Sequence, residues 1–236
     1  MYMVNIETVL GANLADLFSF QEKVVVIIDI LRATSTITTL ASKDVSKILA
    51  TDDVEHALSL KEKNDFLAIG ERNGMKVKGF DFGNSPYEIR NAPLKGKKVV
   101  ITTTNGTKVM KMSESASEVL IGSFHNLQAL ANRISNGSRD IILFCAGWKG
   151  RVNMEDTLFA GAVISNLQTK SWHLDDSSKI AKSVYSKEKN NLYKYMLTCE
   201  HPKRLKTKFK NEDIQICFEQ NSTSIIPKVK NMEVIL

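Results

Sequence analysis

Polar side chains suited to binding a phosphate follow the apolar run Val24–Ile30, which predicts a strand buried on both faces. Asp29 lies near the end of this run, where a carboxylate is costly unless it is hydrogen-bonded, paired or bound to a metal. Arg32, Thr34 and Ser35 follow at an expected helix start, where a guanidinium, hydroxyls and backbone N–H groups suit a phosphate. A helix cap with an Asp29–Arg32 ion pair explains the same residues equally well.

A second polar stretch, GERNGMKVKGFDFGNSPYE, follows the predicted strand at residues 66–70. It concentrates charged and amide side chains in an expected loop, namely Glu71, Arg72, Asp81, Asn84 and Ser85. Loops of this length in compact domains are often functional. The stretch also predicts a helix start, with Ser85 as the N-cap and a proline at the first helical position. Both interpretations can hold together.

A third stretch, TTTNGT, directly follows the apolar run at residues 97–102. Its later residues are Thr104, Asn105, Gly106 and Thr107. Consecutive hydroxyls and a glycine that opens a helix can surround an anion with backbone N–H groups. Asn-Gly by itself indicates only a turn, and the GxxxxGK[ST] spacing of a P-loop is absent.

A fourth stretch, CAGWKGRVNMEDTLFAG, leads from a predicted strand at residues 140–147 into a helix. Glu155 and Asp156 at the helix start could be hard oxygen ligands for magnesium, although complementing the helix dipole is the commoner role. The spacing of Cys145 and Arg151 matches the CxxxxxR loop of cysteine phosphatases. Nothing near Cys145 would lower its pKa, so we do not expect it to be a nucleophile.

These stretches need a sheet that brings the strand ends together, because ligands of open α/β sheets collect beyond the carboxyl ends of strands. Short apolar runs alternate with amphipathic segments and no flexible linker interrupts them. The pattern predicts a single α/β domain over residues 1–236, with a mixed or mostly parallel sheet and helices on both faces. Expected strands are 24–30, 66–70, 97–102, 118–122, 140–147, 214–218 and 223–226. Expected helices are 34–43, 52–63, 125–134, an amphipathic one at 155–167, and a basic helical region beyond 177.

The net charge of +6 is concentrated in one segment. Residues 182–210 contain nine Lys and Arg against Glu188 and Glu200, so this segment carries +7 and the rest of the chain −1. A basic face could steer an anionic substrate, contact nucleic acid or simply be solvated. Because no known nucleic-acid-binding motif is present, we expect no nucleic-acid partner.

Composition also bears on the compartment. The chain lacks an apolar run of the roughly 18 residues that a membrane helix needs, and it shows no secretory signal. Its three cysteines form no CxxC pair. We therefore expect a cytoplasmic protein with free thiols and no membrane contact.

All four polar stretches occur in the order and spacing typical of the 2-phosphosulfolactate phosphatase (ComB) family, which the chain resembles over residues 4–230. The segments HPKRL at 201–205 and DIQIC at 213–217 extend the resemblance. The resemblance implies a ComB-like α/β fold, Mg²⁺ as cofactor, and hydrolysis of (2R)-2-phospho-3-sulfolactate to 3-sulfolactate and phosphate in coenzyme M biosynthesis. The expected partners are this small anionic ester and, in a homodimer, a second copy of the chain.

Each polar stretch then supplies candidate site residues. The catalytic candidates are Asp29, Glu71, Asp81 and Glu155. The candidate metal ligands are Asp29, Glu155 and Asp156. The candidate substrate-binding residues are Arg32, Thr34, Ser35, Arg72, Asn84, Ser85, Thr104, Asn105, Gly106 and Thr107. Asp29 does not begin a DxDx[TV] signature, which favours direct attack by water over a phospho-aspartate. Another small acidic phosphomonoester remains an alternative substrate, and a non-catalytic binding protein that uses residues 182–210 remains an alternative of another class.

Overall fold

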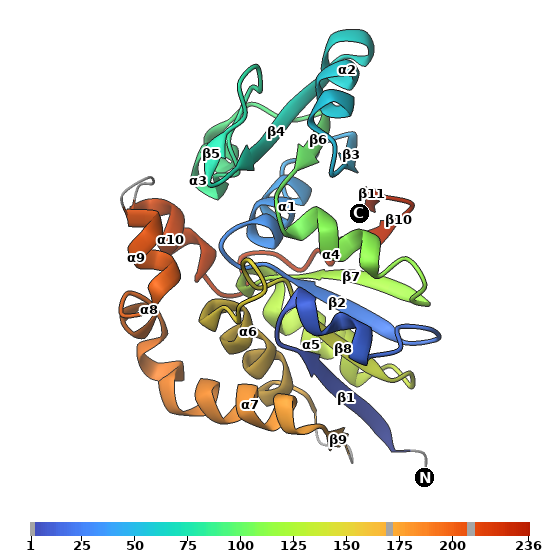
Figure 1. Cartoon of the computed structure of the whole chain (residues 1–236), viewed down its shortest axis with the longest axis vertical. Coiled ribbons are helices and arrows are strands. Elements are labelled where there is room, and N and C mark those ends of the chain that lie inside the picture. The colour runs from blue at the N-terminus through green and yellow to red at the C-terminus, as the bar shows by residue number, and fades with distance from the viewer. Residues whose placement is uncertain (1–2, 169–171, 207–210) are drawn as a thin grey trace.

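The apolar run at Val24–Ile28 forms β2, a strand inside one large sheet (Figure 1). Its side chains alternate between two cores: Val24, Val26 and Ile28 join one, and Val25 and Ile27 join the other. The computed structural model describes residues 3–168, 172–206 and 211–236. In it, burial of β2 on both faces confirms the expected α/β class, since such runs belong to sheets covered on both sides.

The sheet is mixed and mostly parallel, with the strand order β5-β4-β6-β3-β11-β10-β7-β2-β8-β1-β9. Besides β2, the strands are β1 Val4–Val9, β3 Lys47–Ala50, β4 Phe66–Arg72, β5 Met75–Lys76, β6 Lys98–Thr102, β7 Glu118–Gly122, β8 Ile141–Cys145, β9 Trp172–Leu174, β10 Lys228–Lys230 and β11 Glu233–Ile235. Strands β4, β6 and β3 run parallel to each other, as do β7, β2, β8, β1 and β9. The antiparallel hairpin β10–β11 joins these two parallel groups.

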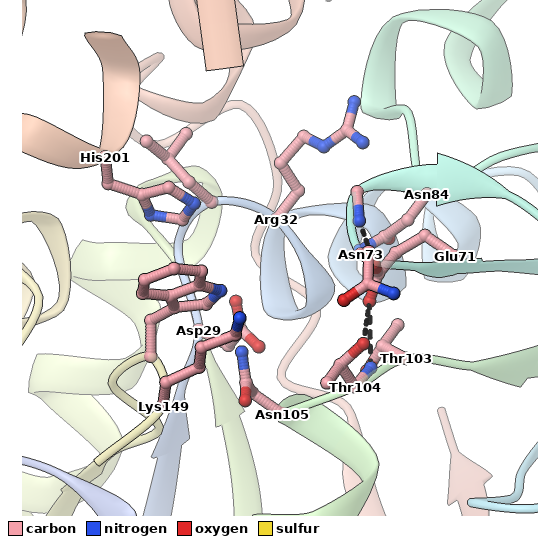
Figure 2. Close-up of a pocket in the computed structure, with 13 residues that line it drawn as sticks. Asp29, Arg32, Glu71, Asn73, Asn84, Thr103, Thr104, Asn105, Lys149 and His201 are labelled. Atoms are coloured by element: carbon pink, nitrogen blue, oxygen red, sulfur yellow. Dashed lines mark hydrogen bonds between the residues drawn. The ribbon is translucent and has the colours of Figure 1, made fainter. Parts of the chain in front are cut away.

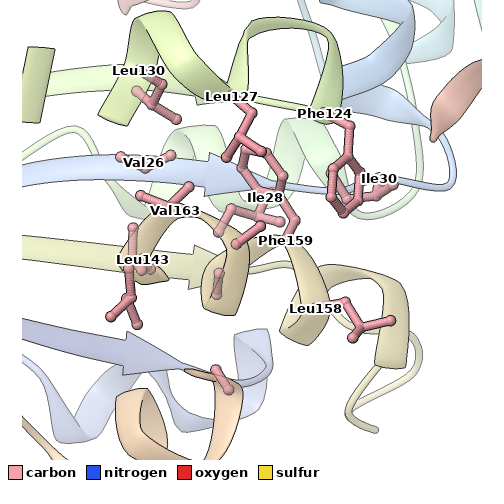
Figure 3. Close-up of a cluster of buried hydrophobic side chains, with 14 of the residues drawn as sticks. Val26, Ile28, Ile30, Phe124, Leu127, Leu130, Leu143, Leu158, Phe159 and Val163 are labelled. Atoms are coloured by element: carbon pink, nitrogen blue, oxygen red, sulfur yellow. The ribbon is translucent and has the colours of Figure 1, made fainter. Parts of the chain in front are cut away.

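Helices cover the sheet on both faces (Figure 1). Their bounds are α1 Ala33–Ala41, α2 Val54–Asn64, α3 Pro86–Asn91, α4 Gly106–Met112, α5 Leu127–Ser135, α6 Met154–Ser165, α7 Asp176–Glu188, α8 Leu192–Met196, α9 Glu200–Lys206 and α10 Asn211–Cys217. Helices α5, α6 and α7 contribute to the core that contains Ile28, whereas α1 and α4 contribute to the core that contains Ile27. Figure 3 shows the first core, in which the rings of Phe124 and Phe159 meet edge to face with centroids 5.1 Å apart.

Helix α6 is buried all round rather than amphipathic, which corrects the expectation for residues 155–167. Every residue from Glu155 to Ile164 is buried. The outer face of α6 is covered by α7, and Gly161 permits the close approach, because a Cβ there would lie 2.1 Å from the Ala181 carbonyl oxygen. The carboxylates at the start of α6 are therefore removed from water.

The C-terminal region differs from the sequence-based prediction, and the two strands expected at 214–218 and 223–226 are wrong. Residues 214–217 belong to helix α10, whose first turn carries acidic side chains that favour a helix. Backbone N–H groups of Asn221 and Thr223 bond to the carbonyls of Phe124 and His125, which ties that segment to a loop instead of the sheet. Short apolar runs do not distinguish strand from helix by periodicity alone.

Within the described ranges, no helix combines the length and apolar character needed to cross a membrane.

Candidate active site

A cavity of about 430 Å³ opens beyond the ends of β2, β4, β6 and β8 (Figure 2). Each of the four polar stretches contributes to its wall, and α9 adds one residue from the basic segment. The lining residues are Asp29, Leu31, Arg32, Glu71, Asn73, Gly74, Asn84, Thr103, Thr104, Asn105, Trp148, Lys149 and His201. Strand ends that are far apart in the chain therefore meet at one place.

Asp29 supplies a buried carboxylate to this cavity, because it directly follows β2 and only 9% of it is exposed. Its backbone is held by Thr34: the Thr34 N–H donates to the Asp29 carbonyl at 2.9 Å, and the Asp29 N–H donates to Thr34 Oγ1 at 3.1 Å. Burial raises the pKa of Asp29 to about 6, and the nearby carboxylates of Glu71 and Glu155 act in the same direction. The Ala33 N–H and His201 partly oppose this shift.

Arg32 forms a buried ion pair with Asp213 of α10, which corrects the alternative interpretation of an Asp29–Arg32 pair. Arg32 Nη1 donates to Asp213 Oδ2 at 2.8 Å. The other carboxylate oxygen of Asp213 accepts from Ser85 Oγ at 2.6 Å and from the Tyr87 N–H at 3.2 Å. Ser85 also caps α3, as expected, by accepting from the Glu88 N–H. Sequence reasoning did not select Asp213. A carboxylate beside apolar residues that become buried needs a hydrogen-bonding or ionic partner, and the sequence could have indicated Asp213 in this way.

Glu71 links two loops of the cavity wall (Figure 2). Its Oε1 accepts hydrogen bonds from the Thr104 N–H at 2.8 Å and from Thr104 Oγ1 at 2.9 Å. Its Oε2 accepts from the Gly74 N–H at 2.6 Å. Glu71 therefore positions the loop after β6 relative to the hairpin after β4.

The start of α4 lies directly against Asp29 and the start of α1. A Cβ on Gly106 would lie 2.5 Å from the Ala33 Cβ and 3.3 Å from Asp29 Oδ2, so only glycine fits without a shift. Thr107 Oγ1 donates to the Thr103 carbonyl at 2.7 Å and thereby stabilises the turn. Thr103, which sequence reasoning did not select, lines the cavity together with Thr104 and Asn105.

Behind this wall lie the two buried carboxylates at the start of α6. Asp156 accepts from the Ile30 N–H at 2.9 Å and from the Gly147 N–H at 3.2 Å. Burial raises the pKa of Asp156 well above its usual range, and Glu155 and Asp29 raise it further. Glu155 Oε1 bonds to Nδ1 of His201, a residue that sequence reasoning did not select. Glu155 Oε2 is buried and has no hydrogen-bond partner in the described part of the chain.

The candidate metal ligands are not assembled as a set. Across residues 3–168, 172–206 and 211–236, no three His, Cys, Asp or Glu side chains are placed to hold a metal ion together. Asp156 directs its oxygens to backbone N–H groups and Glu155 is bonded to His201. Of the three candidates, Asp29 is the one that lines the cavity.

Other candidate residues contact protein groups outside the cavity. Arg72 Nη2 donates to the Asp52 carbonyl at 2.9 Å and to Thr102 Oγ1 at 2.8 Å. Asp81 pairs with Lys61 at 2.7 Å and accepts from a backbone N–H of β4 at 2.8 Å. The Ser35 hydroxyl donates to the carbonyl of Ile30.

Cys145 is fully buried at the end of β8. Burial raises the pKa of its thiol well above the usual range, and the carboxylates of Asp156 and Glu155 raise it further. A thiol in such surroundings stays protonated at neutral pH, so its setting is opposite to that of a nucleophilic cysteine.

The basic segment runs through the second half of α7, α8 and α9, and its residues 207–210 lie outside the described residues. Lys182, Lys187, Lys189 and Lys194 are exposed. His201 connects this segment to the cavity.

Comparisons with a family model and with individual proteins point to the same family. The family model described as 2-phosphosulpholactate phosphatase matches residues 13–232. A probable 2-phosphosulfolactate phosphatase of Caldanaerobacter subterraneus subsp. tengcongensis is 39% identical over 235 residues, which cover 98% of this chain and 96% of the relative. Relatives of the same name are 38% identical in Thermotoga petrophila, over 89% of this chain and 91% of the relative, and 32% identical in Clostridium perfringens strain SM101, over 98% and 96%.

The match spans β2, all four polar stretches and the C-terminal hairpin as far as residue 232, so it includes every element that contributes to the cavity. The chain belongs to the 2-phosphosulfolactate phosphatase family.

Proposed function

We propose that this protein is a magnesium-dependent phosphatase that hydrolyses (2R)-2-phospho-3-sulfolactate to 3-sulfolactate and phosphate, a step of coenzyme M biosynthesis. The observation that carries the proposal is the composition of the cavity wall. One buried carboxylate, Asp29, shares that wall with the cationic side chains of Arg32 and Lys149. A small ester that bears several negative charges requires cations for binding, and its hydrolysis requires a group that orients water.

The size of the cavity suits this class of substrate. Its volume of about 430 Å³ lies within the range typical of small-molecule sites. Lys149 Nζ lies 4.7 Å from the centre of the Trp148 ring, so the ring holds a cationic side chain at the rim. Guanidinium groups match the oxygens of carboxylate, sulfonate and phosphate better than a point charge does, which makes Arg32 the principal anion-binding residue.

Asp29 fits a magnesium ion, because Mg²⁺ commonly uses one or two protein carboxylates and keeps several waters. The raised pKa of Asp29 shows that its negative charge is not fully compensated by protein groups. When bound, magnesium would neutralise charge on the phosphoryl group and favour in-line attack by water.

The protein groups themselves would bind the ester and manage protons. Glu71 holds the Thr103–Asn105 loop, whose hydroxyl and amide groups would contact the phosphoryl oxygens. Asp29 would accept a hydrogen bond from the attacking water. His201, held at Nδ1 by Glu155, would donate a proton from Nε2 to the oxygen that leaves as the P–O ester bond breaks.

The test is phosphate release from a panel of acidic phosphomonoesters, before and after exhaustive chelation. We expect the highest kcat/KM for phosphosulfolactate, loss of activity on chelation and recovery with added magnesium. Full activity after chelation would contradict the metal requirement. A clear preference for another ester would instead favour the alternative of a phosphatase for a different small acidic phosphomonoester.

A further inference from the structure

A second, smaller cavity lies beyond Arg32, with a volume of about 270 Å³. Arg32, Gly74 and Asn84 line both cavities, and Asp213 and Lys76 line only the smaller one. Arg32 and Asn84 are each more than nine-tenths buried. The two cavities therefore share a junction that is made of buried polar side chains.

A buried amide oxygen lies at this junction. Asn84 Oδ1 is buried and has no hydrogen-bond partner among the residues that the structure describes. Buried polar atoms are nearly always bonded, so a bound molecule or an ordered water is expected to complete this one. The Arg32 guanidinium lines the same junction, and its N–H groups can bind an anionic group there.

Asp213 forms a buried ion pair with this guanidinium. It receives Arg32 Nη1 on one carboxylate oxygen, and Ser85 Oγ and the Tyr87 N–H on the other. Its two oxygens therefore join the loop after β2, helix α3 and helix α10. Buried charge-assisted hydrogen bonds of this kind give a side chain one geometry, because an uncompensated buried guanidinium is costly.

We propose that Asp213 is a positioning residue that holds Arg32 at the junction of the two cavities, where Arg32 recognises an acidic group of the substrate other than its phosphate. The inference rests on the proposed function of the main cavity. Asp213 thereby contributes to the preference for phosphate esters that carry a second acid over simple phosphomonoesters.

The experiment measures binding by calorimetry with two probes, 3-sulfolactate and inorganic phosphate. Asp213→Asn keeps the size of the side chain and removes its charge, so the ion pair between Arg32 and Asp213 is lost. We expect 3-sulfolactate to bind roughly 10- to 100-fold more weakly, as when a charged hydrogen-bonded partner is removed, while phosphate binding is unchanged. Asp213→Glu, which restores the charge, should recover part of the loss.

The matched control is Glu219→Gln. Glu219 follows α10 and forms a two-bond ion pair with Arg90 of α3, so it joins the same two helices without contacting Arg32. We expect this variant to bind both probes like the wild type. An equal loss in Glu219→Gln would show that helix docking matters and not the Arg32–Asp213 pair, and it would overturn the inference.

Thermal unfolding of each variant checks that it is folded. Should Asp213→Asn not fold, Ser85→Ala takes its place, because it removes the hydroxyl that orients Asp213 and keeps the ion pair; we expect a smaller loss of 3-sulfolactate binding. Equal weakening of both probes, no weakening of either, or failure of the wild type to bind 3-sulfolactate would overturn the inference. A wild type that binds 3-sulfolactate but hydrolyses no ester would contradict only the proposed function.

Discussion

At the scale of single residues, the buried negative charge of Asp29 destabilises the folded protein, and the neighbouring protein groups offset this only in part. Burial raises its pKa from 3.8 to about 6, so the folded chain holds this proton more tightly than the unfolded chain does. For an acid shifted in this direction, stability falls as the pH rises from the unfolded to the folded pKa, and the full cost is present above the folded pKa. Functional sites are where such costs are retained.

Replacing Asp29 with asparagine should therefore stabilise the metal-free protein at pH values above the folded pKa. We expect a gain on the order of 1–3 kcal/mol there, because asparagine avoids burying a charge. The gain should vanish below the ordinary aspartate pKa of 3.8, where Asp29 is protonated in both states. Thermal unfolding of both proteins in the presence of a chelator, at one pH below 3.8 and one pH above about 6, measures this difference in stability. A wild type that is the more stable form at both pH values would contradict the argument.

Catalysis should respond to the same substitution in the opposite direction. If Asp29 holds magnesium and orients water, Asp29→Asn should lower kcat/KM by roughly 100-fold or more, the scale observed when one key electrostatic group is removed. The folded fraction, taken from the unfolding curves, separates this loss from misfolding. Near-normal kcat/KM would exclude Asp29 from the chemistry and direct attention to Glu155 and Asp156.

At the scale of elements, the contact between α1 and α4 determines how closely the Thr103–Asn105 loop approaches Asp29. Gly106 makes this contact possible, since a Cβ there would overlap the Ala33 Cβ at 2.5 Å. The start of α4 therefore lies against both the start of α1 and the Asp29 carboxylate. Helix α3 is held in a comparable way, by Ser85 and by the ion pair between Arg90 and Glu219.

Gly106→Ala should force α4 away from α1. We expect a loss of about 1–3 kcal/mol in the free energy of unfolding, typical of overpacking, together with reduced kcat/KM because the loop after β6 shifts from Asp29. Denaturant unfolding and phosphate release measure the two effects. Lys108→Ala is the control, since Lys108 is exposed on the same helix. Wild-type stability and activity in Gly106→Ala would show that the α1–α4 contact can relax.

At the scale of the whole molecule, two parallel groups of strands meet across the C-terminal hairpin β10–β11. The cavity draws residues from both groups: Glu71 and Thr104 come from one, and Asp29 and Trp148 come from the other. Because β10 and β11 join the two groups of strands, the geometry of the site depends on the last residues of the chain. The basic segment reaches the cavity through α9, which contributes His201.

The basic segment at 182–210 should not recognise a nucleic-acid sequence. Contacts to phosphates alone weaken steeply as salt increases, so any binding to DNA or RNA should be weak at physiological salt and independent of sequence. Filter binding or fluorescence anisotropy with several unrelated oligonucleotides over a salt series measures this. Sequence-selective, tight binding at physiological salt would support the alternative of a nucleic-acid-binding protein.

Several features could be predicted from the sequence because they depend on local chemistry. The β-branched run at β2, the cap formed by Ser85, and the polar stretches at strand ends each follow from neighbouring residues. The α/β class follows from their alternation along the chain. Short elements such as β3, β10 and β11 escaped prediction, because strands of three or four residues leave too little periodicity to detect.

Only the tertiary structure decided which polar side chains meet. Arg32 and Asp213 are 181 residues apart in the chain, and their pairing depends on how α10 packs against α3. Arg72 and Asp81 come from an equally polar stretch, yet they contact the protein outside the cavity. A carboxylate or guanidinium has the same intrinsic chemistry everywhere in a sequence. Its partner, its burial and therefore its pKa are set by long-range packing, which local sequence patterns do not contain.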